Sequence, residues 1–230
     1  MMTQQPKYYR DLLDRLLEQD NTDSHQQRLQ VLRDKFKYRG PAHFDQEDQL
    51  VVPGDFDCSS KQLTSLAGAP VKVGGYFDCS NNQLTSLVGS PTAVGSSFLC
   101  YNNQLTSLAG APTIVSGRFR CDNNPLTSLV GAPKKVGGYF WCYNNQLTSL
   151  EGIPRSINGG FVITVNATTP LLKILTVEGI TRFYFYKPNS DDRIPELESL
   201  FKEFYGRGAR GRLLCGIEML KMGYKRNTGR

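Results

Sequence analysis

The chain has little of the chemistry that most enzymes use, with only two histidines and one tryptophan in 230 residues. His25 and His43 are isolated, and neither has a cysteine or carboxylate at the spacing of a metal site or a catalytic triad. No apolar run approaches the roughly 20 residues that a membrane-spanning helix needs. The N-terminal residues also lack the apolar stretch of a signal peptide. These absences predict a soluble cytoplasmic protein that is not an enzyme and has no metal or other cofactor.

Positive charge is concentrated at one end of the chain, although the formal net charge is only +6. Residues 204–230 carry seven basic side chains against Glu218 alone. A basic segment of this kind favours contacts with the phosphates of a nucleic acid. The candidates for such contacts are Arg207, Arg210, Arg212, Lys225 and Arg226.

A 21-residue repeat occupies about half of the chain. Five copies follow one another without gaps, and a decayed sixth copy begins at Phe161. The copies share the pattern F-x-C-x-x-N-x-L-T-S-L-x-G-x-P, except that Lys61 replaces the Asn of the first. They cover residues 56–76, 77–97, 98–118, 119–139 and 140–160.

The repeat predicts stacked coils with a buried interior. Phe and Cys stand two residues apart, so both point to one face of a strand and the residue between them points away. Stacking the copies about 4.8 Å apart then gives buried rows of Phe, Leu and Val. The repeated Asn is expected to bond backbone groups of its own turn and the next. Gly-x-Pro excludes a helix on the far side of each coil, which is expected to be irregular or 3₁₀.

This pattern resembles the leucine-rich repeat L-x-L-x-x-N-x-L-x-x-L, with Phe and Cys in the two strand positions. In detail it is similar to short repeat proteins of tailed bacteriophages and bacteria that share N-N-Q-L-T-S-L-x-G-x-P. The resemblance implies an α+β solenoid with a parallel β-sheet of about six strands. Most members of that group have no assigned activity, so the resemblance implies the fold more than the function.

The two ends of a solenoid need caps, and the flanking sequences predict them. Apolar stripes at 7–19 and 24–37 predict a helical N-terminal cap within 1–54. The solenoid is expected to cover 55–166, followed by an α/β C-terminal cap with a basic tail over 167–230. The elements expected there are a short helix at 171–177, a closing strand at 181–186, and helices at 194–205 and 209–222. Pro195 suits the first turn of the third of these elements.

The six cysteines are predicted to be structural. Five occupy the buried strand position of the repeat, and no Cys-x-x-Cys pair offers the spacing of a zinc site. Cys215 falls on the apolar stripe of the last expected helix. Cysteine packs well as a small hydrophobe, so we expect all six thiols to lie in the core.

The outward strand positions differ from copy to copy, whereas the buried positions are nearly identical. Exposed Tyr, Trp and Arg supply most of the energy of protein interfaces, although aromatic residues also simply favour strands. The candidate partner-binding residues are Tyr76, Leu99, Tyr101, Arg118, Arg120, Tyr139, Trp141 and Tyr143. The other positions expected to face outward are Asp55, Asp57, Ser59, Asp78, Ser80, Ser97, Asp122, Gly160, Val162 and Thr164.

Three functions are compatible with this surface. The favoured one is a non-enzymatic, phage-encoded module that binds or blocks a host protein in the host cytoplasm. The first alternative is binding of single-stranded nucleic acid, with Arg118 and Arg120 beside aromatic rings on which bases stack. Against it, Asp55, Asp57 and Asp78 would repel a phosphate backbone. The second alternative is a structural component of a virus particle or another large assembly.

Overall fold

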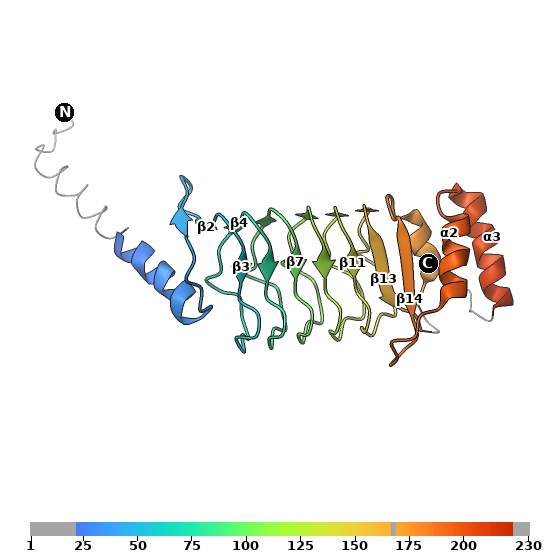
Figure 1. Cartoon of the computed structure of the whole chain (residues 1–230), viewed down its shortest axis with the longest axis horizontal. Helices are drawn as coiled ribbons and strands as arrows, with labels where there is room; N and C mark the ends of the chain where they lie inside the picture. Colours follow the sequence, from blue (N-terminus) through green and yellow to red (C-terminus); the bar gives the residue numbers. More distant parts are fainter. Residues whose placement is uncertain (1–21, 167–168, 223–230) are drawn as a thin grey trace, which may run out of the picture.

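The repeat forms an elongated rod of stacked coils (Figure 1). The structure, a computed structural model, describes residues 22–166 and 169–222 of the chain. Equivalent strands of successive coils lie 21 residues apart, so each copy of the repeat makes one turn of the solenoid. Among the described residues, no helix is both long and apolar enough to cross a membrane.

One side of the rod is a parallel sheet of seven strands. These are β3 (Phe56–Asp57), β5 (Phe77–Asp78), β7 (Phe98–Leu99), β9 (Phe119–Arg120), β11 (Phe140–Trp141), β13 (Gly160–Thr164) and β14 (Arg182–Tyr186). They follow the order β14-β13-β11-β9-β7-β5-β3, and equivalent residues of neighbouring copies stand in register. The sequence predicted about six strands, one for each copy of the repeat. The closing strand β14 adds the seventh because it pairs with β13 along its whole length.

The opposite side of the coils also carries short strands, which corrects the expected irregular or 3₁₀ backbone. These are β1 (His43–Phe44), β2 (Leu50–Val52), β4 (Lys72–Val73), β6 (Ala93–Val94), β8 (Ile114–Val115), β10 (Lys135–Val136) and β12 (Ser156–Ile157). They form the sheets β1-β2-β4-β6 and β8-β10-β12, in which only the β1–β2 pair is antiparallel. In each copy the Gly-x-Pro segment precedes the short strand and does not interrupt it. The backbone of each coil then forms hydrogen bonds with the preceding coil; for example, the Gly74 N–H donates to the Val52 carbonyl at 2.8 Å.

The interior contains the predicted rows of side chains. The six phenylalanines from Phe56 to Phe161 have no exposed surface. Their rings stack along the rod, with centroid separations from 5.2 Å for Phe77–Phe98 to 5.8 Å for Phe140–Phe161. The rows of Leu, Cys and Val or Ile are buried around them. A continuous core therefore runs through all the coils, and each copy depends on its neighbours for burial.

The repeated asparagine holds successive coils together by hydrogen bonds. Asn82 Nδ2 donates to the carbonyls of Cys79 in its own coil and Cys58 in the preceding coil, each at 3.0 Å. Its Oδ1 accepts the N–H of Leu63 at 2.9 Å. The sequence predicted bonds to the next turn, but the partner is the preceding one. The amide thus satisfies backbone groups that neither sheet serves.

At the N-terminal end, residues 22–34 are helical. Leu32 in this helix and Phe36 just after it are buried. The Phe36 ring packs edge-on against the ring of Phe56 in the first coil, with 5.6 Å between the ring centroids. The helix expected at 24–37 is therefore present but ends earlier. The helix expected at 7–19 lies outside the described residues.

At the other end, three elements accompany β14. They are η1 (Leu171–Thr176), α2 (Pro195–Phe204) and α3 (Gly208–Lys221). The short helix expected at 171–177 is 3₁₀, whereas α2 and α3 occur where helices were expected, with Pro195 at the start of α2. Phe201 of α2 packs on Phe183 and Phe185 of β14. Figure 1 shows α2 between β14 and α3.

Candidate functional site

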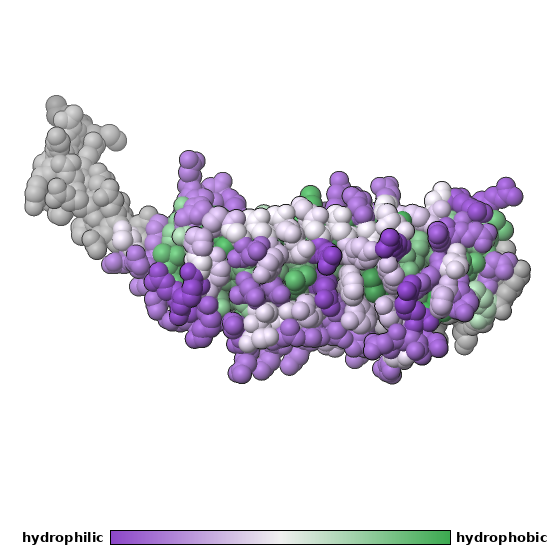
Figure 2. Space-filling model, in the orientation of Figure 1, coloured by the Kyte–Doolittle hydropathy of each residue, from purple (hydrophilic) through white to green (hydrophobic). Residues whose placement is uncertain are grey.

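The eight candidate partner-binding residues lie on the outward face of the seven-stranded sheet. Register places Arg120 between Leu99 and Trp141 on neighbouring strands. Arg118 is exposed, and the other seven are half-buried. In the view of Figure 2, small hydrophobic patches lie among hydrophilic side chains along the middle of the rod. The sheet therefore gathers these residues, while their role in binding stays a prediction.

Four residues expected to face outward are buried instead: Ser80, Asp122, Gly160 and Val162. Large aromatic side chains lie beside Gly160 and Val162. A Cβ atom on Gly160 would stand 2.4 Å from Cε1 of Tyr139, so the tyrosine ring lies directly over the glycine. Val162 is in register between Trp141 and Tyr184, two large aromatic side chains. The sequence pattern gave the direction of each side chain but not the size of what lies beside it.

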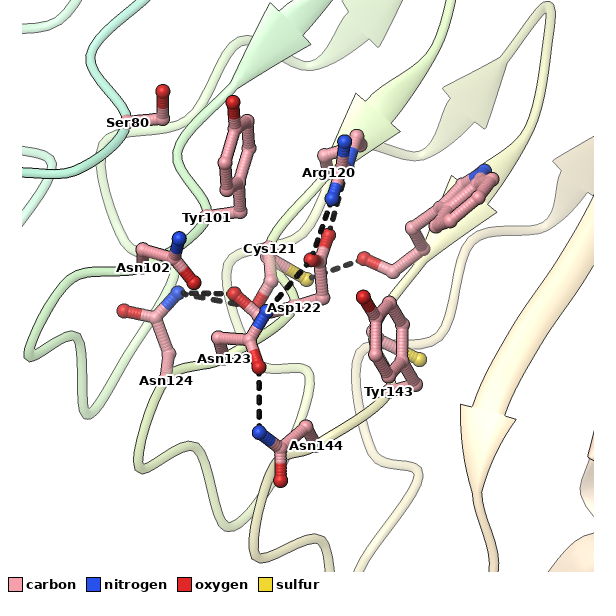
Figure 3. A network of polar contacts seen from close by, with 12 residues as sticks. Ser80, Tyr101, Asn102, Arg120, Cys121, Asp122, Asn123, Asn124, Tyr143 and Asn144 are labelled. Carbon is pink, nitrogen blue, oxygen red and sulfur yellow. Dashed lines mark hydrogen bonds and ion pairs between the residues drawn. The ribbon is translucent and has the colours of Figure 1, made fainter. Parts of the chain in front are cut away.

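Arg120 is anchored within the protein. Its Nε donates to Oδ1 of Asp122 at 2.9 Å and its Nη2 to Oδ2 at 2.7 Å (Figure 3). The guanidinium also lies 4.0 Å from the ring centroid of Tyr101 and 4.9 Å from that of Trp141. The hydrogen bonds to Asp122 raise the pKa of Arg120 above its usual value. Asp122 neutralises Arg120, and the rings of Tyr101 and Trp141 already lie against its guanidinium, so Arg120 is held within the face and is not an unpaired charge.

Next to Arg120 the face is hollowed into a groove of about 360 Å³, which we call the aromatic groove. Its lining residues are Arg118, Tyr139, Trp141, Val162, Tyr184 and Tyr186. Tyr139 is central to its walls, with ring centroids 6.4 Å from Trp141 and 6.3 Å from Tyr184. Val162 is 2% exposed and lies below these rings, so it forms the floor. Apolar walls with few polar groups are typical of sites that receive a side chain or small ligand.

Two lining residues, Tyr184 and Tyr186, were not among the predicted site residues. Both belong to β14, which was predicted only as a closing strand. The signal was present in the sequence T-R-F-Y-F-Y at 181–186. Its alternation places Phe183 and Phe185 in the core, and the two tyrosines on the outward face.

Trp141 has one polar atom without a partner. Its Nε1 is buried and makes no hydrogen bond to any described residue. A buried donor left unpaired costs about 1–3 kcal/mol.

Arg118 is the unpaired cation of the groove. Its side chain makes no ion pair within 22–166 and 169–222. It is therefore available to a carboxylate or phosphate of a ligand, in contrast to Arg120.

The opposite end of the face is acidic. Asp55, Asp57 and Asp78 lie on or beside the first strands, and each accepts a backbone N–H at 2.9 Å through one side-chain oxygen. Tyr76 lies among them, and burial together with these three carboxylates raises its pKa. Each aspartate thus supports the local backbone and still carries a negative charge on the surface.

The described basic residues near the C-terminus do not line the aromatic groove. Arg207, Arg210 and Arg212 lie on or just before α3, which α2 separates from β14 (Figure 1). The side chain of Arg207 lies 4.0 Å from Glu203. Lys225 and Arg226 lie outside the described residues.

The cysteines occupy the core, as predicted. All six are free thiols and are buried. In the repeat row, burial raises the thiol pKa, as in Cys121, whose Sγ donates to the Trp141 carbonyl at 3.4 Å. No cluster of three or more His, Cys, Asp or Glu side chains suited to a metal ion occurs in the described part of the chain.

His25 does have a carboxylate neighbour, which corrects the sequence analysis. Its Nε2 contacts Asp48 Oδ1, and its ring stacks on Phe44 at 3.7 Å. Asp48 is 23 residues away, and the loop before β2 brings it close. The hydrogen bond from His25 is the main cause that lowers the pKa of Asp48. The pair ties the helical segment at 22–34 to the β1–β2 hairpin.

Comparisons with protein-family models, curated proteins and solved structures gave no significant match. The chain is therefore classed by its own architecture, a solenoid of leucine-rich-repeat-like coils 21 residues apart.

Proposed function

We propose that this protein is a non-catalytic interaction module that binds another protein through the outward face of the seven-stranded sheet. The observation that carries the proposal is the aromatic groove, where Trp141, Tyr139 and Tyr184 surround an apolar floor. Aromatic anchors in a hollow supply much of the energy of protein interfaces. The groove accepts an apolar side chain of the partner. Ordering the groove walls costs little, because the Tyr139 ring already packs against Trp141 and Tyr184.

Charge along the rod gives the partner an orientation. The unpaired Arg118 at the groove favours an acidic group next to the apolar anchor. The acidic end formed by Asp55, Asp57 and Asp78 favours a basic group farther along the partner. Such complementarity mainly sets the rate and register of association.

The experiment is a capture from bacterial lysate with quantitative mass spectrometry. The full chain is compared with Trp141→Ala and Tyr184→Ala, which open two walls of the groove. The matched control is Ile114→Ala, because Ile114 is a large side chain exposed on the opposite side of the coils. We expect a protein that the original chain and the control retain and that both groove variants lose.

A captured protein is then purified and titrated directly. Trp141 is the only tryptophan in the chain, so its fluorescence reports occupation of the groove. A saturable change in emission supports the proposal. Retention of the same proteins by the groove variants and the control, or binding that leaves Trp141 unaffected, would contradict it.

Nucleic-acid binding is the second candidate, favoured by the unpaired Arg118 beside the aromatic rings of Tyr139 and Trp141. The position of α3 away from the groove weighs against it, as does the acidic end of the face. A titration with oligo(dT) at two salt concentrations tests it through Trp141 emission. Binding that weakens steeply with salt favours this candidate, and the absence of binding removes it.

Three finer features belong to the same proposal. The protein is phage-encoded and blocks a host protein in the host cytoplasm. The helical residues 22–34 and the segment from 169 to 222 cap the two ends of the solenoid. Leu32 and Phe36 support the first cap, since they are buried against the first coil. The expected division into 1–54, 55–166 and 167–230 follows from these caps.

A further inference from the structure

A second groove of about 310 Å³ lies between the last strand of the sheet and α2. We call it the basic groove. Its polar lining includes Arg182, Arg193, Lys202, Ser199, Thr181 and Glu198. Tyr184 lines both grooves and therefore separates the basic groove from the aromatic one. Neither the predicted site residues nor the proposed function uses this second groove.

The charges of the basic groove do not cancel. Glu198 is neutralised by Arg193, whose Nε donates to Oε1 at 3.0 Å and whose Nη2 contacts Oε2. Arg182 and Lys202 have no carboxylate partner within the described ranges. Arg182 does interact with the side chains of Tyr184 and Tyr139, which raise its pKa, but these groups are neutral and leave its charge uncompensated. The groove therefore has two uncompensated positive charges. Both side chains are exposed, so a ligand reaches them without opening the fold.

Neutral donors stand beside these cations. Ser199 and Thr181 contribute exposed hydroxyl groups to the lining. These hydroxyls are directed by rotation of a single side-chain bond, so they adapt to acceptors of different geometry.

The backbone edge of β14 adds a further donor. The backbone of Phe185 faces the edge of β14 that is not paired with β13. Its N–H donates to Glu198 Oε1 at 3.1 Å, and its carbonyl accepts the Ile194 N–H at 2.7 Å. Alternate residues of a parallel strand face the same neighbour, so Phe183 turns its N–H to the same edge. This N–H has no partner among the described residues, and Phe183 lines the groove.

We propose that the basic groove binds a phosphoryl group. Arg182 and Lys202 lack a carboxylate partner, and their two positive charges match a phosphate dianion. A single carboxylate would compensate only one of these two charges. The hydroxyls and the free backbone N–H supply donors for the remaining phosphoryl oxygens, whereas a carboxylate has only two oxygens to offer. Lys202 and Ser199, which the test below alters, do not line the aromatic groove, so either assignment can fail alone.

The test is a titration of the full chain with sodium phosphate at pH 7.5, followed by ³¹P NMR and calorimetry at constant ionic strength. The variants are Lys202→Met, which keeps the apolar stem but removes the charge, and the double variant Lys202→Met/Ser199→Ala. Lys135→Met is the control, because Lys135 is exposed on the opposite side of the coils. Sodium acetate in the same buffer tests whether any anion suffices.

Saturable phosphate binding in the original chain and in the control supports the proposal when Lys202→Met weakens it about fivefold or more. The double variant is expected to weaken it further, and acetate to compete poorly. Equal binding by Lys202→Met and the control would overturn the proposal, as would equal competition by acetate or no binding in the millimolar range.

Two further probes identify the source of the phosphoryl group, O-phosphotyrosine and uridine 5′-monophosphate. Tighter binding of the first than of phosphate supports a phosphorylated protein, and tighter binding of the second supports a nucleotide. In either case Lys202→Met must remove the binding, and a probe that binds unchanged to this variant counts against the site.

Discussion

Arg120 donates hydrogen bonds to both carboxylate oxygens of Asp122, and Asp122 has no exposed surface. The side chain of Arg120 is itself 27% exposed, so the pair extends from the buried Asp122 to the outward face of the seven-stranded sheet. A residue that the sequence marks as a partner contact is therefore also part of the structure. We therefore expect its substitution to change stability as well as the proposed binding.

The first prediction concerns this pair. Arg120→Ala leaves the carboxylate of Asp122 buried without its cation, and we expect a loss of about 3 kcal/mol in the free energy of unfolding. The double variant Arg120→Ala/Asp122→Ala should recover much of that loss, since no charge is then buried alone. Urea denaturation followed by circular dichroism measures both. Arg118→Ala is the control and should change stability by less than about 0.5 kcal/mol; equal losses for Arg118→Ala and Arg120→Ala would contradict the prediction.

The second prediction concerns the asparagine row. Asn124 Nδ2 donates to the carbonyls of Cys100 and Cys121 at 3.1 Å, and its Oδ1 accepts the Leu105 N–H at 3.0 Å. Asn124→Ala removes these bonds and the one from Nδ2 to the Asp122 carbonyl at 3.2 Å, so we expect it to lower the free energy of unfolding by about 2 kcal/mol or more. Gln104→Ala, at an exposed position nearby, should have almost no effect. The same denaturation experiment measures both, and a neutral Asn124→Ala would mean that water replaces the amide.

The third prediction concerns the wall of the aromatic groove. Gly160→Ala places a methyl group where the Tyr139 ring now lies, so the ring must swing away. We expect partner affinity to fall about tenfold while the free energy of unfolding drops by only about 1 kcal/mol. Titration of Trp141 fluorescence with the captured partner measures the affinity. Gly54→Ala is the matched control, because a Cβ there meets no atom within 4 Å. Unchanged affinity in Gly160→Ala would show that Tyr139 does not shape the site.

The fourth prediction concerns the thiols. Burial raises the pKa of Cys215 to about 11 and that of the five cysteines in the repeat row further above the ordinary value. Because the thiolate is the reactive form, only about one part in a thousand of Cys215 is reactive at pH 8. We expect no fast reaction with Ellman's reagent in the folded chain and six reactive thiols in guanidinium chloride. A thiol that reacts in the folded chain at the unfolded rate would place that cysteine outside the core.

Much of the candidate site followed from the two-residue period of the strands, and the rest did not. The pattern correctly placed Tyr101, Arg118 and Trp141 on one face. It misplaced Asp122, because alternation gives the direction of a side chain and not whether Arg120 will fold over it. Tyr184 was missed because β14 lies outside the 21-residue repeat, so the alternation at 181–186 predicted a closing strand without adding its tyrosines to the candidate site.

The sequence by itself determined the solenoid. Five nearly identical copies at a fixed 21-residue spacing have one way to bury Phe, Cys and Leu together, which is to stack in register. The tertiary structure decided where the surface is hollow and which charges remain unpaired. Those properties depend on contacts between different coils, such as Tyr139 over Gly160 or Arg120 on Asp122, and on strand β14 and helix α2 packing against the last coil. Distances across neighbouring strands set them, and no local pattern in the chain specifies those distances.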